Sequence, residues 1–294
     1  MLDLSICIVN WNVKDLLKAC LGSIYTNTKD ISFEVIVVDN NSSDESIRMI
    51  KSDFPQVKLI ENKTNAGFTK ANNLAIKIAQ GRNIMLLNPD TEVIDNALNR
   101  MVRFLDSRRD CGALGCKLLN TDGSLQRSCR TFPTLEVMLY SALFLNSLFP
   151  KSRLFGKYFM TWWDFNETRE VDQPMGSALM IKKEILDKVG LFDENIFIWF
   201  DEVDLCYRIK KAGFKIFFTP EAQITHHLSQ SFKQWKSVPQ ILKGTVIWRK
   251  SRNYFFKKHK GMPSVFALWA FDILQIAIVI SVLYSIAKII LRGF

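Results

Sequence analysis

Four short apolar runs in the first 95 residues constrain the fold more than any other feature of the chain. They are Leu4–Asn10, Phe33–Val38, Val57–Glu61 and Ile84–Leu87. Each is rich in apolar and β-branched residues, which favour strands. Helix-like segments separate them, at about 14–26, 45–52 and 69–79. Strands that alternate with helices form right-handed βαβ units around a parallel sheet. Residues 1–95 are therefore predicted to be a Rossmann-like, nucleotide-binding half.

Polar residues follow the first two predicted strands directly. Asn10 and Asn12 end the first strand, and Asp39 and Asn41 end the second. Asp44 is predicted to cap the next helix, which leaves Asp39 free at the strand tip. An acidic residue there can accept hydrogen bonds from a ribose or a base. Because the first turn has no G-x-G-x-x-G pattern, NAD and FAD are disfavoured.

Asn88-Pro89-Asp90 follows the fourth predicted strand. It places the Asp90 carboxylate just beyond the carboxyl end of the strand, where ligands bind in open α/β sheets. Carboxylate oxygens suit hard cations such as Mg²⁺ or Mn²⁺, which would in turn hold a diphosphate. Taken alone, the same three residues also fit a simple turn.

Acidic residues gather again within the aromatic stretch Phe197–Arg208, at Asp201, Glu202 and Asp204. Adjacent carboxylates near apolar rings repel each other and lose solvation, so at least one should have a raised pKa. A general base is adjusted toward neutral pH in this way. We expect extended backbone here, with Asp201 and Glu202 on opposite sides.

Two strands are predicted further along, at 214–218 and 222–227, and the second ends in His226 and His227. These are two of the three histidines in the chain. A neutral imidazole is a reasonable ligand for a divalent cation, and core or surface positions are the alternative.

Composition limits the class of protein. The net charge of +10 suggests an anionic partner. Six cysteines without C-x-x-C spacing indicate a reducing compartment and argue against a zinc site or a disulfide framework. A strand pattern begins at once, so no signal peptide is expected. The aromatic segment 158–163 is predicted to pack in a core, with a surface toward the bilayer or a lipid-linked acceptor as the alternative.

The last 50 residues change character. Residues 243–260 mix basic and aromatic side chains, which fits nucleic acid or an anionic membrane surface. Val265–Ala287 has one charge, Asp272, and is long enough to span a bilayer. We therefore expect membrane attachment and no nucleic acid. An in-plane helix, or a seam between copies in a homo-oligomer, also fits the polar positions Ser281 and Ser285. The basic run predicts that its side is cytoplasmic.

The series Ile8–Asn12, Val37–Asp44, Asn65–Phe68 and Leu87–Asp90 resembles family 2 glycosyltransferases of the GT-A fold, closest to the bacterial rhamnosyltransferase-like branch. The resemblance covers roughly residues 4–260. It implies a nucleotide site and a reduced form of the Asp-x-Asp metal motif, in which Asn88 replaces the first Asp. The nucleotide site would contain Asn10, Asn12, Asp39, Asn41, Asn65, Gly67 and Asn88.

The same resemblance implies Mn²⁺ or Mg²⁺ held by Asp90 and His226, with His227 as the alternative ligand. Residues 201–208 are similar to the family pattern Glu-Asp-x-Asp-Leu-Cys-x-Arg. Its second acidic position, which deprotonates the acceptor, is Glu202 here rather than Asp. Glu202 is therefore the expected catalytic base, and Asp201 is the alternative base.

The fold expected from these observations is α/β of GT-A type, with a mostly parallel central sheet, helices on both faces and a C-terminal membrane-associated helical segment. Residues 1–95 would bind the nucleotide sugar, 96–240 would bind the acceptor and carry catalysis, and 241–294 would associate with the membrane.

The resemblance implies an inverting, metal-dependent hexosyltransferase in cell-surface polysaccharide synthesis, at the cytoplasmic face of the inner membrane. It would move a sugar, with rhamnose the leading guess, from a dTDP- or UDP-sugar to a saccharide or lipid-linked acceptor. A membrane-bound, non-catalytic sugar-nucleotide-binding relative is one alternative. A nucleotidyltransferase is another, but Asn10-Trp11-Asn12 is not the Gly- and Arg/Lys-rich phosphate loop that it needs.

Overall fold

The computed structural model describes residues 1–227 and 238–292, in two compact units. Unit 1 contains Met1–Arg130 and Phe165–Ser251, and unit 2 contains Thr131–Asp164 and the chain from Arg252 onward. This division does not follow the expected boundaries at 95 and 240. Strands from both sides of residue 95 pair in one sheet, and an internal segment groups with the C-terminal helices.

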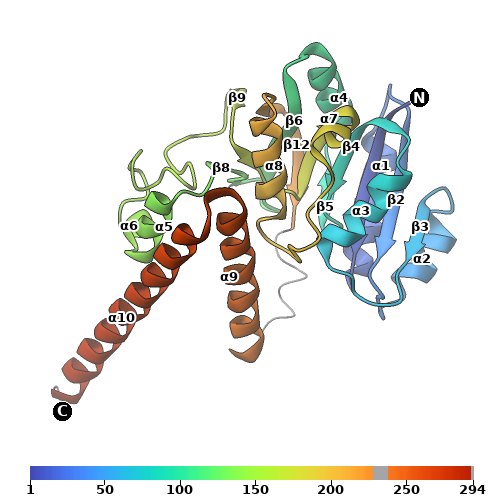
Figure 1. Ribbon diagram of the computed structural model, residues 1–294. Coiled ribbons are helices and arrows are strands. Elements are labelled where there is room, and N and C mark those ends of the chain that lie inside the picture. Colours follow the sequence, from blue (N-terminus) through green and yellow to red (C-terminus); the bar gives the residue numbers. More distant parts are fainter. Residues whose placement is uncertain (228–237, 293–294) are drawn as a thin grey trace. The chain divides into compact units, whose positions relative to one another are not determined.

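A ten-stranded sheet runs through the described part of unit 1 (Figure 1). Its main path is β3 (Lys58–Glu61), β2 (Phe33–Asp39), β1 (Leu2–Asn10), β4 (Gly81–Leu87), β11 (Ala178–Lys182), β6 (Cys111–Leu119), β12 (Lys215–His226) and β5 (Thr91–Val93). Off this path, β7 (Leu125–Gln126) pairs with β6, and β9 (Arg169–Glu170) pairs with β12. A separate pair joins β8 (Cys129–Arg130) to β10 (Gln173–Pro174).

Most of these strands run in one direction. β1 is parallel to β2 and β4, β2 to β3, and β6 to β12. β11 is antiparallel to both β4 and β6, and β5 is antiparallel to β12. The carboxyl ends of β1, β2, β4 and β12 therefore lie along the same edge of the sheet. The predicted mostly parallel sheet is confirmed.

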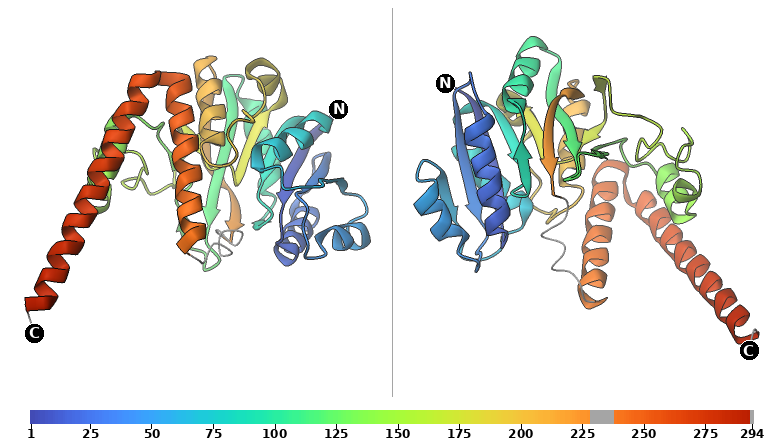
Figure 2. Two further views of the ribbon diagram at one scale, coloured as in Figure 1. Left: turned by 60° about the horizontal axis from the view of Figure 1, so that its bottom comes forward. Right: turned by 180° about the vertical axis from the view of Figure 1, so that it is seen from behind.

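Helices cover both faces of the sheet (Figures 1 and 2). One face carries α1 (Lys14–Asn27), α2 (Ser46–Asp53) and α4 (Ala97–Ser107), and the other carries α3 (Phe68–Ile78), α7 (Lys183–Val189) and α8 (Asp201–Lys211). Alternate side chains of a strand point to opposite faces. Ile6 and Ile8 of β1 accordingly share a core cluster with Leu17 and Leu21 of α1.

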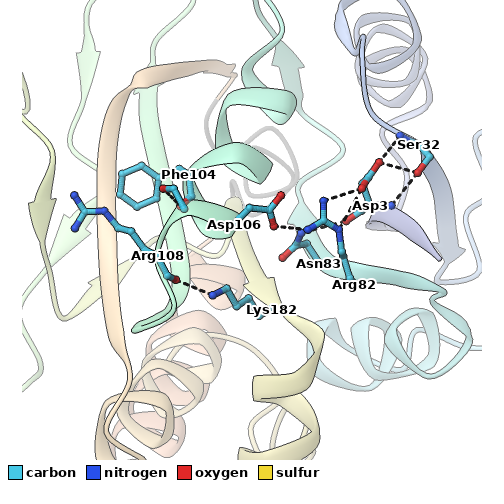
Figure 3. Close-up of polar contacts among 9 residues, drawn as sticks. Asp3, Ser32, Arg82, Asn83, Phe104, Asp106, Arg108 and Lys182 are labelled. Atoms are coloured by element: carbon cyan, nitrogen blue, oxygen red, sulfur yellow. Dashed lines mark hydrogen bonds and ion pairs between the residues drawn. The ribbon is translucent and has the colours of Figure 1, made fainter.

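Ion pairs close the edge of the sheet at the amino ends of β1 and β4. Arg82 of β4 pairs with Asp3 of β1, N to O 2.8 Å, and with Asp106 of α4 (Figure 3). Lys182 Nζ donates to the carbonyl oxygen of Arg108 over 2.7 Å. The charged side chains at this edge thus have partners within the edge itself. The candidate site residues lie at the opposite ends of the strands.

One continuous strand replaces the two predicted at 214–218 and 222–227. β12 stays parallel to β6 throughout, and its register shifts between Thr219 and Gln223. Pro220 lies within the shift. Proline has no N–H to donate, and a bulge accommodates it without ending the strand.

Unit 2 contains α5 (Leu135–Ala142), α6 (Leu145–Leu148), the later part of α9 (Val238–Lys260) and α10 (Met262–Arg292). The predicted core packing of the aromatic segment is confirmed, because Tyr158, Met160 and Trp163 are buried. α5 packs against α10. The one charge in the apolar run, Asp272, accepts two hydrogen bonds from Arg252, at 2.9 and 2.7 Å.

α10 contains the apolar segment Met262–Ile286, which is long and apolar enough to cross a membrane. The mean hydropathy of its 18-residue window is 2.2, and only 11% of that window is buried. The core helix of a soluble protein would bury most of such a window, so this helix is a candidate for membrane association.

Candidate active site

Asn10 and Asp39 are register partners at the ends of β1 and β2. Asn10 Nδ2 donates to Asp39 Oδ2 over 2.8 Å and to Ser42 Oγ over 3.1 Å. The Ser42 amide donates to Asp39 Oδ1 over 2.8 Å. The Asp39 carboxylate is thus buried and engaged by its own loop, not free as expected. Asn10 Oδ1 is buried with no hydrogen-bond partner among the described residues, so it can still accept an N–H.

The loop after β2 is tied to the loop after β1. Asn12 Oδ1 accepts from the Ser43 amide over 2.7 Å, and Asp44 Oδ2 accepts from the Lys14 amide over 2.7 Å. The Asp44 carboxylate therefore accepts from the Lys14 amide in the first turn of α1 and from the Ser46 amide at the start of α2. Asn41 is exposed, with a φ of 63° that asparagine tolerates well.

Gly67 joins this region to a later part of the chain. Its amide donates to Asn65 Oδ1 over 3.0 Å, and its carbonyl accepts from Asn40 Nδ2 over 3.3 Å. Its φ is 84°, and a Cβ there would lie 2.6 Å from the ring of Phe197. Only glycine combines this φ with such a close approach to the Phe197 ring.

Asp90 and His226 meet where the end of β12 lies beside the start of β5. His226 is the register partner of Thr91. The Nε2 atom of His226 is 3.3 Å from Asp90 Oδ1 and 3.5 Å from Asn88 Nδ2. Asp90 and His226 are both buried. The structure thus brings together the two residues expected to hold a cation, next to Asn88.

Gln126 of β7 orients the ring of His226. Its Nε2 donates to Asn120 Oδ1 over 3.0 Å and to the His226 carbonyl over 3.2 Å. Both partners are acceptors, so the amide orientation is fixed and Oε1 is the atom 2.7 Å from His226 Nδ1. In the neutral ring Nδ1 then carries the proton, and Nε2 faces Asp90 with its lone pair.

His227 lies differently. Its Nε2 is 2.6 Å from Glu92 Oε1, and its amide donates to the Asp90 carbonyl over 2.8 Å. Its contacts are with Glu92 and the Asp90 backbone, whereas His226 faces the Asp90 carboxylate. Of the two histidines, His226 has the geometry of a ligand.

This arrangement fits a divalent cation. A carboxylate oxygen and an imidazole lone pair are both acceptors, and two facing acceptors are stabilised when a cation lies between them. Within the described ranges, no three or more His, Cys, Asp or Glu residues form a cluster suited to a metal. The protein would therefore supply few ligands, and a diphosphate and water would supply the rest, as is usual for Mg²⁺ sites.

Asp201 and Glu202 begin α8, so the expected extended backbone is wrong at this point. Consecutive helical residues lie on adjacent faces, not opposite ones. The preceding Trp199 and Phe200 have φ of 59° and 61°, which turns the chain sharply into the helix. Aromatic residues adopt this conformation at a cost of about 1–2 kcal/mol each.

The first part of α9 holds this turn. Ser251 Oγ donates to the Ile198 carbonyl over 2.9 Å. The rings of Trp248 and Phe200 meet edge to face, with centroids 5.8 Å apart. A hydrogen bond and an aromatic pair of this kind contribute about 1 kcal/mol each, which offsets part of the backbone strain.

The carboxylate pair is electrostatically unusual. Burial, and then the charge of Glu202, raise the pKa of Asp201 well above its ordinary value. Burial also raises the pKa of Glu202, while its own backbone hydrogen bond and the Arg130 charge oppose this. The interaction with Glu202 raises the pKa of Asp201, whereas the interaction with Asp201 lowers the pKa of Glu202. Asp201 is the more deeply buried, so it holds the proton and Glu202 is the carboxylate.

Asp204 has a different role. Its Oδ2 accepts from Arg208 Nε over 2.8 Å, and Arg208 donates to the carbonyls of Val189, Gly190 and Leu191. This buried pair ties α8 to the end of α7. The third acidic residue thus stabilises the helix that carries the other two.

A short chain of contacts connects the carboxylate pair to the Asp90 region. A Cβ at Gly176 would lie 3.5 Å from the Cβ of Glu202. The next residue, Ser177, accepts a hydrogen bond from the Asn88 amide over 2.9 Å. The backbone around Gly176 therefore lies between the acidic pair and the Asn88–Asp90 turn.

Ser42, Gln126 and Ser251 belong to the site but were not singled out from the sequence. Gln126 is one polar residue among many in a loop-like stretch, and only the β6–β7 pairing brings it to His226. Ser42 lies within the motif Val37–Asp44, and this is the only sequence feature that points to it. No sequence feature points to Ser251.

Comparisons with known proteins show the family of the chain. The family model for Glycosyl transferase family 2 matches residues 5–165, more than half of the chain. The N-acetylglucosaminyl-diphospho-decaprenol L-rhamnosyltransferase of Mycobacterium tuberculosis is 27% identical over 208 residues, 67% of each chain. The rhamnosyltransferase WbbL of Escherichia coli K12 is 25% identical over 240 residues, 77% of this chain and 85% of that protein.

Other relatives are much longer. The O-antigen biosynthesis protein RfbC of Myxococcus xanthus is 26% identical over 222 residues, 74% of this chain. The matched region spans 16% of RfbC, and 23% of the uncharacterized protein y4gI of Sinorhizobium fredii.

Solved structures share the fold at low sequence identity. GalNAc-T7, solved with UDP, GalNAc and Mn²⁺, matches with a TM-score of 0.58 and 18% identity, over 90% of this chain and 52% of that one. The Pyrobaculum calidifontis mannosyltransferase PcManGT, solved with GDP-Man and Mn²⁺, matches with a TM-score of 0.52 and 16% identity, over 99% and 83%.

Proposed function

The chain belongs to glycosyltransferase family 2 and has the GT-A fold, and from this premise we propose that it is an inverting, metal-dependent hexosyltransferase. Its donor is a dTDP- or UDP-sugar, and rhamnose is the leading candidate for the sugar. Its acceptor is a saccharide or a lipid-linked saccharide of a cell-surface polysaccharide. Two relatives carry the name rhamnosyltransferase, and this supports the choice of sugar.

One observation carries the proposal. The lone pair of His226 Nε2 faces the Asp90 carboxylate at the same sheet edge as Asn10 and Asp39. In a purely structural contact a neutral His226 would donate from Nε2 to the carboxylate, but Gln126 accepts the ring proton at Nδ1, so that two acceptors face each other. The pair is built to receive a cation, and strand-tip polar groups beside it suit a nucleotide.

The nucleotide would lie at the ends of β1 and β2. Asn10 Oδ1 has acceptor capacity left, which suits the ring N–H of uracil or thymine. Asp39 holds Asn10 and the Ser42 loop in place, and it contacts the base or ribose through this cluster. Asn12 and Asn41 line the same loops, and Asn65 and Gly67 form the adjacent wall.

Asp90 and His226 would hold Mn²⁺ or Mg²⁺, with Asn88 beside them. When bound, such a cation offsets the charge that develops on the departing nucleoside diphosphate. The tautomer set by Gln126 keeps Nε2 available as a ligand, which is the usual effect of a hydrogen bond to the other ring nitrogen of a metal-binding histidine.

Glu202 would deprotonate the acceptor hydroxyl. It is the ionised member of the pair, and part of its surface reaches solvent, so an acceptor can approach it. The neighbouring Asp201, protonated, would position it. Attack on the anomeric carbon from the face opposite the leaving diphosphate is a single displacement, which inverts the anomeric configuration.

The chain would work at the cytoplasmic face of the inner membrane, attached through α10. The apolar helix and the basic residues of α9, such as Lys257 and Lys258, support this placement. A lipid-linked acceptor would be available there. We propose no nucleic acid partner, and a homo-oligomeric seam along α10 is the alternative use of its exposed face.

The test is transfer with a panel of sugar nucleotides, in the presence of Mn²⁺, Mg²⁺ or EDTA, with release of the nucleoside diphosphate as the readout. We expect turnover with a dTDP- or UDP-sugar, loss of transfer in EDTA and recovery with Mn²⁺ or Mg²⁺. Full activity in EDTA would leave Asp90 as a turn residue. Binding of a sugar nucleotide without turnover for any acceptor would favour a non-catalytic relative.

A further inference from the structure

Unit 2 exposes an apolar and basic segment apart from α10. Leu148, Phe149 and Leu154 are 67%, 52% and 49% exposed. Exposed Lys151, Arg153 and Lys157 alternate with them. We refer to residues 145–157 as the apolar-basic loop. No acidic residue occurs between 137 and 163. Lys157 pairs with Glu136 of α5, N to O 3.9 Å, so Lys151 and Arg153 carry the positive charge beside the apolar side chains.

The loop has a defined conformation. The ring of Phe155 contacts both Tyr140 of α5, with centroids 5.1 Å apart, and Phe149, at 5.6 Å. Ser152 Oγ accepts from the amides of Leu154 and Phe155, over 3.2 and 3.3 Å. The exposed Phe149 is thus held outward by an ordered aromatic contact.

The same unit contains the candidate membrane helix. α5 packs on α10, and α5 and α6 lie beside the amino-terminal half of α10 (Figures 1 and 2). In that half, Val265 and Leu268 are buried, and Asp272 is paired with Arg252. Beyond Asp272 the apolar side chains are exposed, for example Ile273 at 68% and Ile280 at 60%. Phe266 and Trp269 are also exposed, at 56% and 48%, but the continuous exposed apolar stretch of α10 begins after Asp272.

We propose that the apolar-basic loop is a second membrane contact, which inserts Leu148, Phe149 and Leu154 into the headgroup region of an anionic bilayer. The proposal rests on the membrane attachment of α10 proposed above. Single exposed apolar residues need no explanation, but three together beside the basic Lys151 and Arg153 match an anionic interface. Each basic residue near such a surface strengthens binding by roughly fivefold.

A site-specific probe tests this in the full-length chain. All six native cysteines are buried, so a cysteine introduced by Phe149→Cys can be labelled selectively with an environment-sensitive fluorophore. Ile78→Cys is the matched control, because Ile78 is an apolar residue of unit 1 that is 44% exposed. The labelled variants are reconstituted with vesicles of phosphatidylcholine with or without 30 mol% phosphatidylglycerol (about one anionic lipid in three, a typical anionic surface), and flotation measures attachment.

We expect a blue shift and a rise in emission at position 149 that are larger with phosphatidylglycerol, and neither change at position 78. Lys151→Glu in the Phe149→Cys background should reduce the response. Flotation with unchanged emission at 149 would overturn the loop contact and leave the attachment of α10 standing. Failure to float would overturn both. A change that depends on protein concentration in detergent would assign the loop to contact with a second copy of the chain instead.

Discussion

Gln126→Leu should weaken metal activation without disturbing the nucleotide pocket. In the native chain, Gln126 Oε1 keeps the proton of His226 on Nδ1, over a contact of 2.7 Å. Leucine removes that acceptor. The proton can then move to Nε2, which lies 3.3 Å from Asp90 Oδ1, and donate to the carboxylate. This new hydrogen bond occupies both groups that would otherwise bind the cation.

The size of the effect follows from the competing bond. A hydrogen bond to a charged group contributes about 1.5–3 kcal/mol, which corresponds to roughly a ten- to hundredfold change in an equilibrium constant. Loss of the group that hydrogen-bonds a metal-binding side chain changes metal affinity over a similar range, about 10–100-fold. The Mn²⁺ concentration for half-maximal transfer should rise by this factor, while the rate at saturating Mn²⁺ changes little.

The assay measures initial transfer rates against Mn²⁺ concentration at saturating donor and acceptor. Nucleotide affinity without metal and the melting temperature serve as controls for folding. His227→Ala is the matched variant, because His227 contacts Glu92 rather than the Asp90 carboxylate, and it should leave the Mn²⁺ requirement unchanged. An unaltered requirement in Gln126→Leu, or an equal increase in both variants, would refute the tautomer argument.

The remaining predictions concern the base, the nucleotide and the membrane. Glu202→Gln should lower the transfer rate by about two to four orders of magnitude with donor affinity unchanged by titration, and Asp201→Asn should cost less; the reverse order would give the role to Asp201. A base must be ionised, and burial raises the pKa of Glu202. The wild-type rate should therefore fall as the pH decreases through a value above 4.5, the ordinary pKa of Glu. A fall in rate only below pH 4.5 would contradict the assignment. Asp39→Ala should weaken UDP or dTDP binding by roughly two- to tenfold through lost hydrogen bonds, as measured by calorimetry, and unchanged affinity for both would remove Asp39 from the site. Removal of residues 273–294, which keeps the Arg252–Asp272 pair, should give a chain that needs no detergent and retains nucleotide affinity; a full-length chain that is already soluble without detergent would end the membrane interpretation.

The nucleotide half could be predicted because its signals are local. Short apolar runs become strands wherever turn-forming residues end them, and parallel pairing then brings Asn10, Asp39 and Asp90 to one edge. The prediction of two strands around Pro220 is wrong. Proline usually interrupts a strand, but here a register shift against β6 accommodates it. The helical start at Asp201 was missed because the preceding aromatic residues resemble a strand, and their left-handed φ values depend on contacts from α9.

The division into two units could not be predicted from local sequence patterns, for a related reason. Residues 131–164 join the C-terminal helices through packing of α5 on α10, two elements more than 100 residues apart. Gln126 shows the same limit within the site. Its importance comes from one contact with His226 across the sheet, and glutamine in a turn-rich stretch carries no local signal.

The dependence of the Trp199–Phe200 turn on α9 also sets an order of events during synthesis. A ribosome releases the amino end of a chain first, and early segments begin to fold while later ones are still being made. The strands that carry Asn10, Asp39 and Asp90 therefore emerge long before Trp248 and Ser251. Until α9 has emerged, the strained turn that presents Glu202 lacks the contacts that hold it.

α10 follows α9 after a single residue, Gly261. The support for Glu202 and the apolar helix thus leave the ribosome almost together. The residues proposed to bind the nucleotide are therefore synthesised well before the contacts that order Glu202, and those contacts are completed just before the apolar helix.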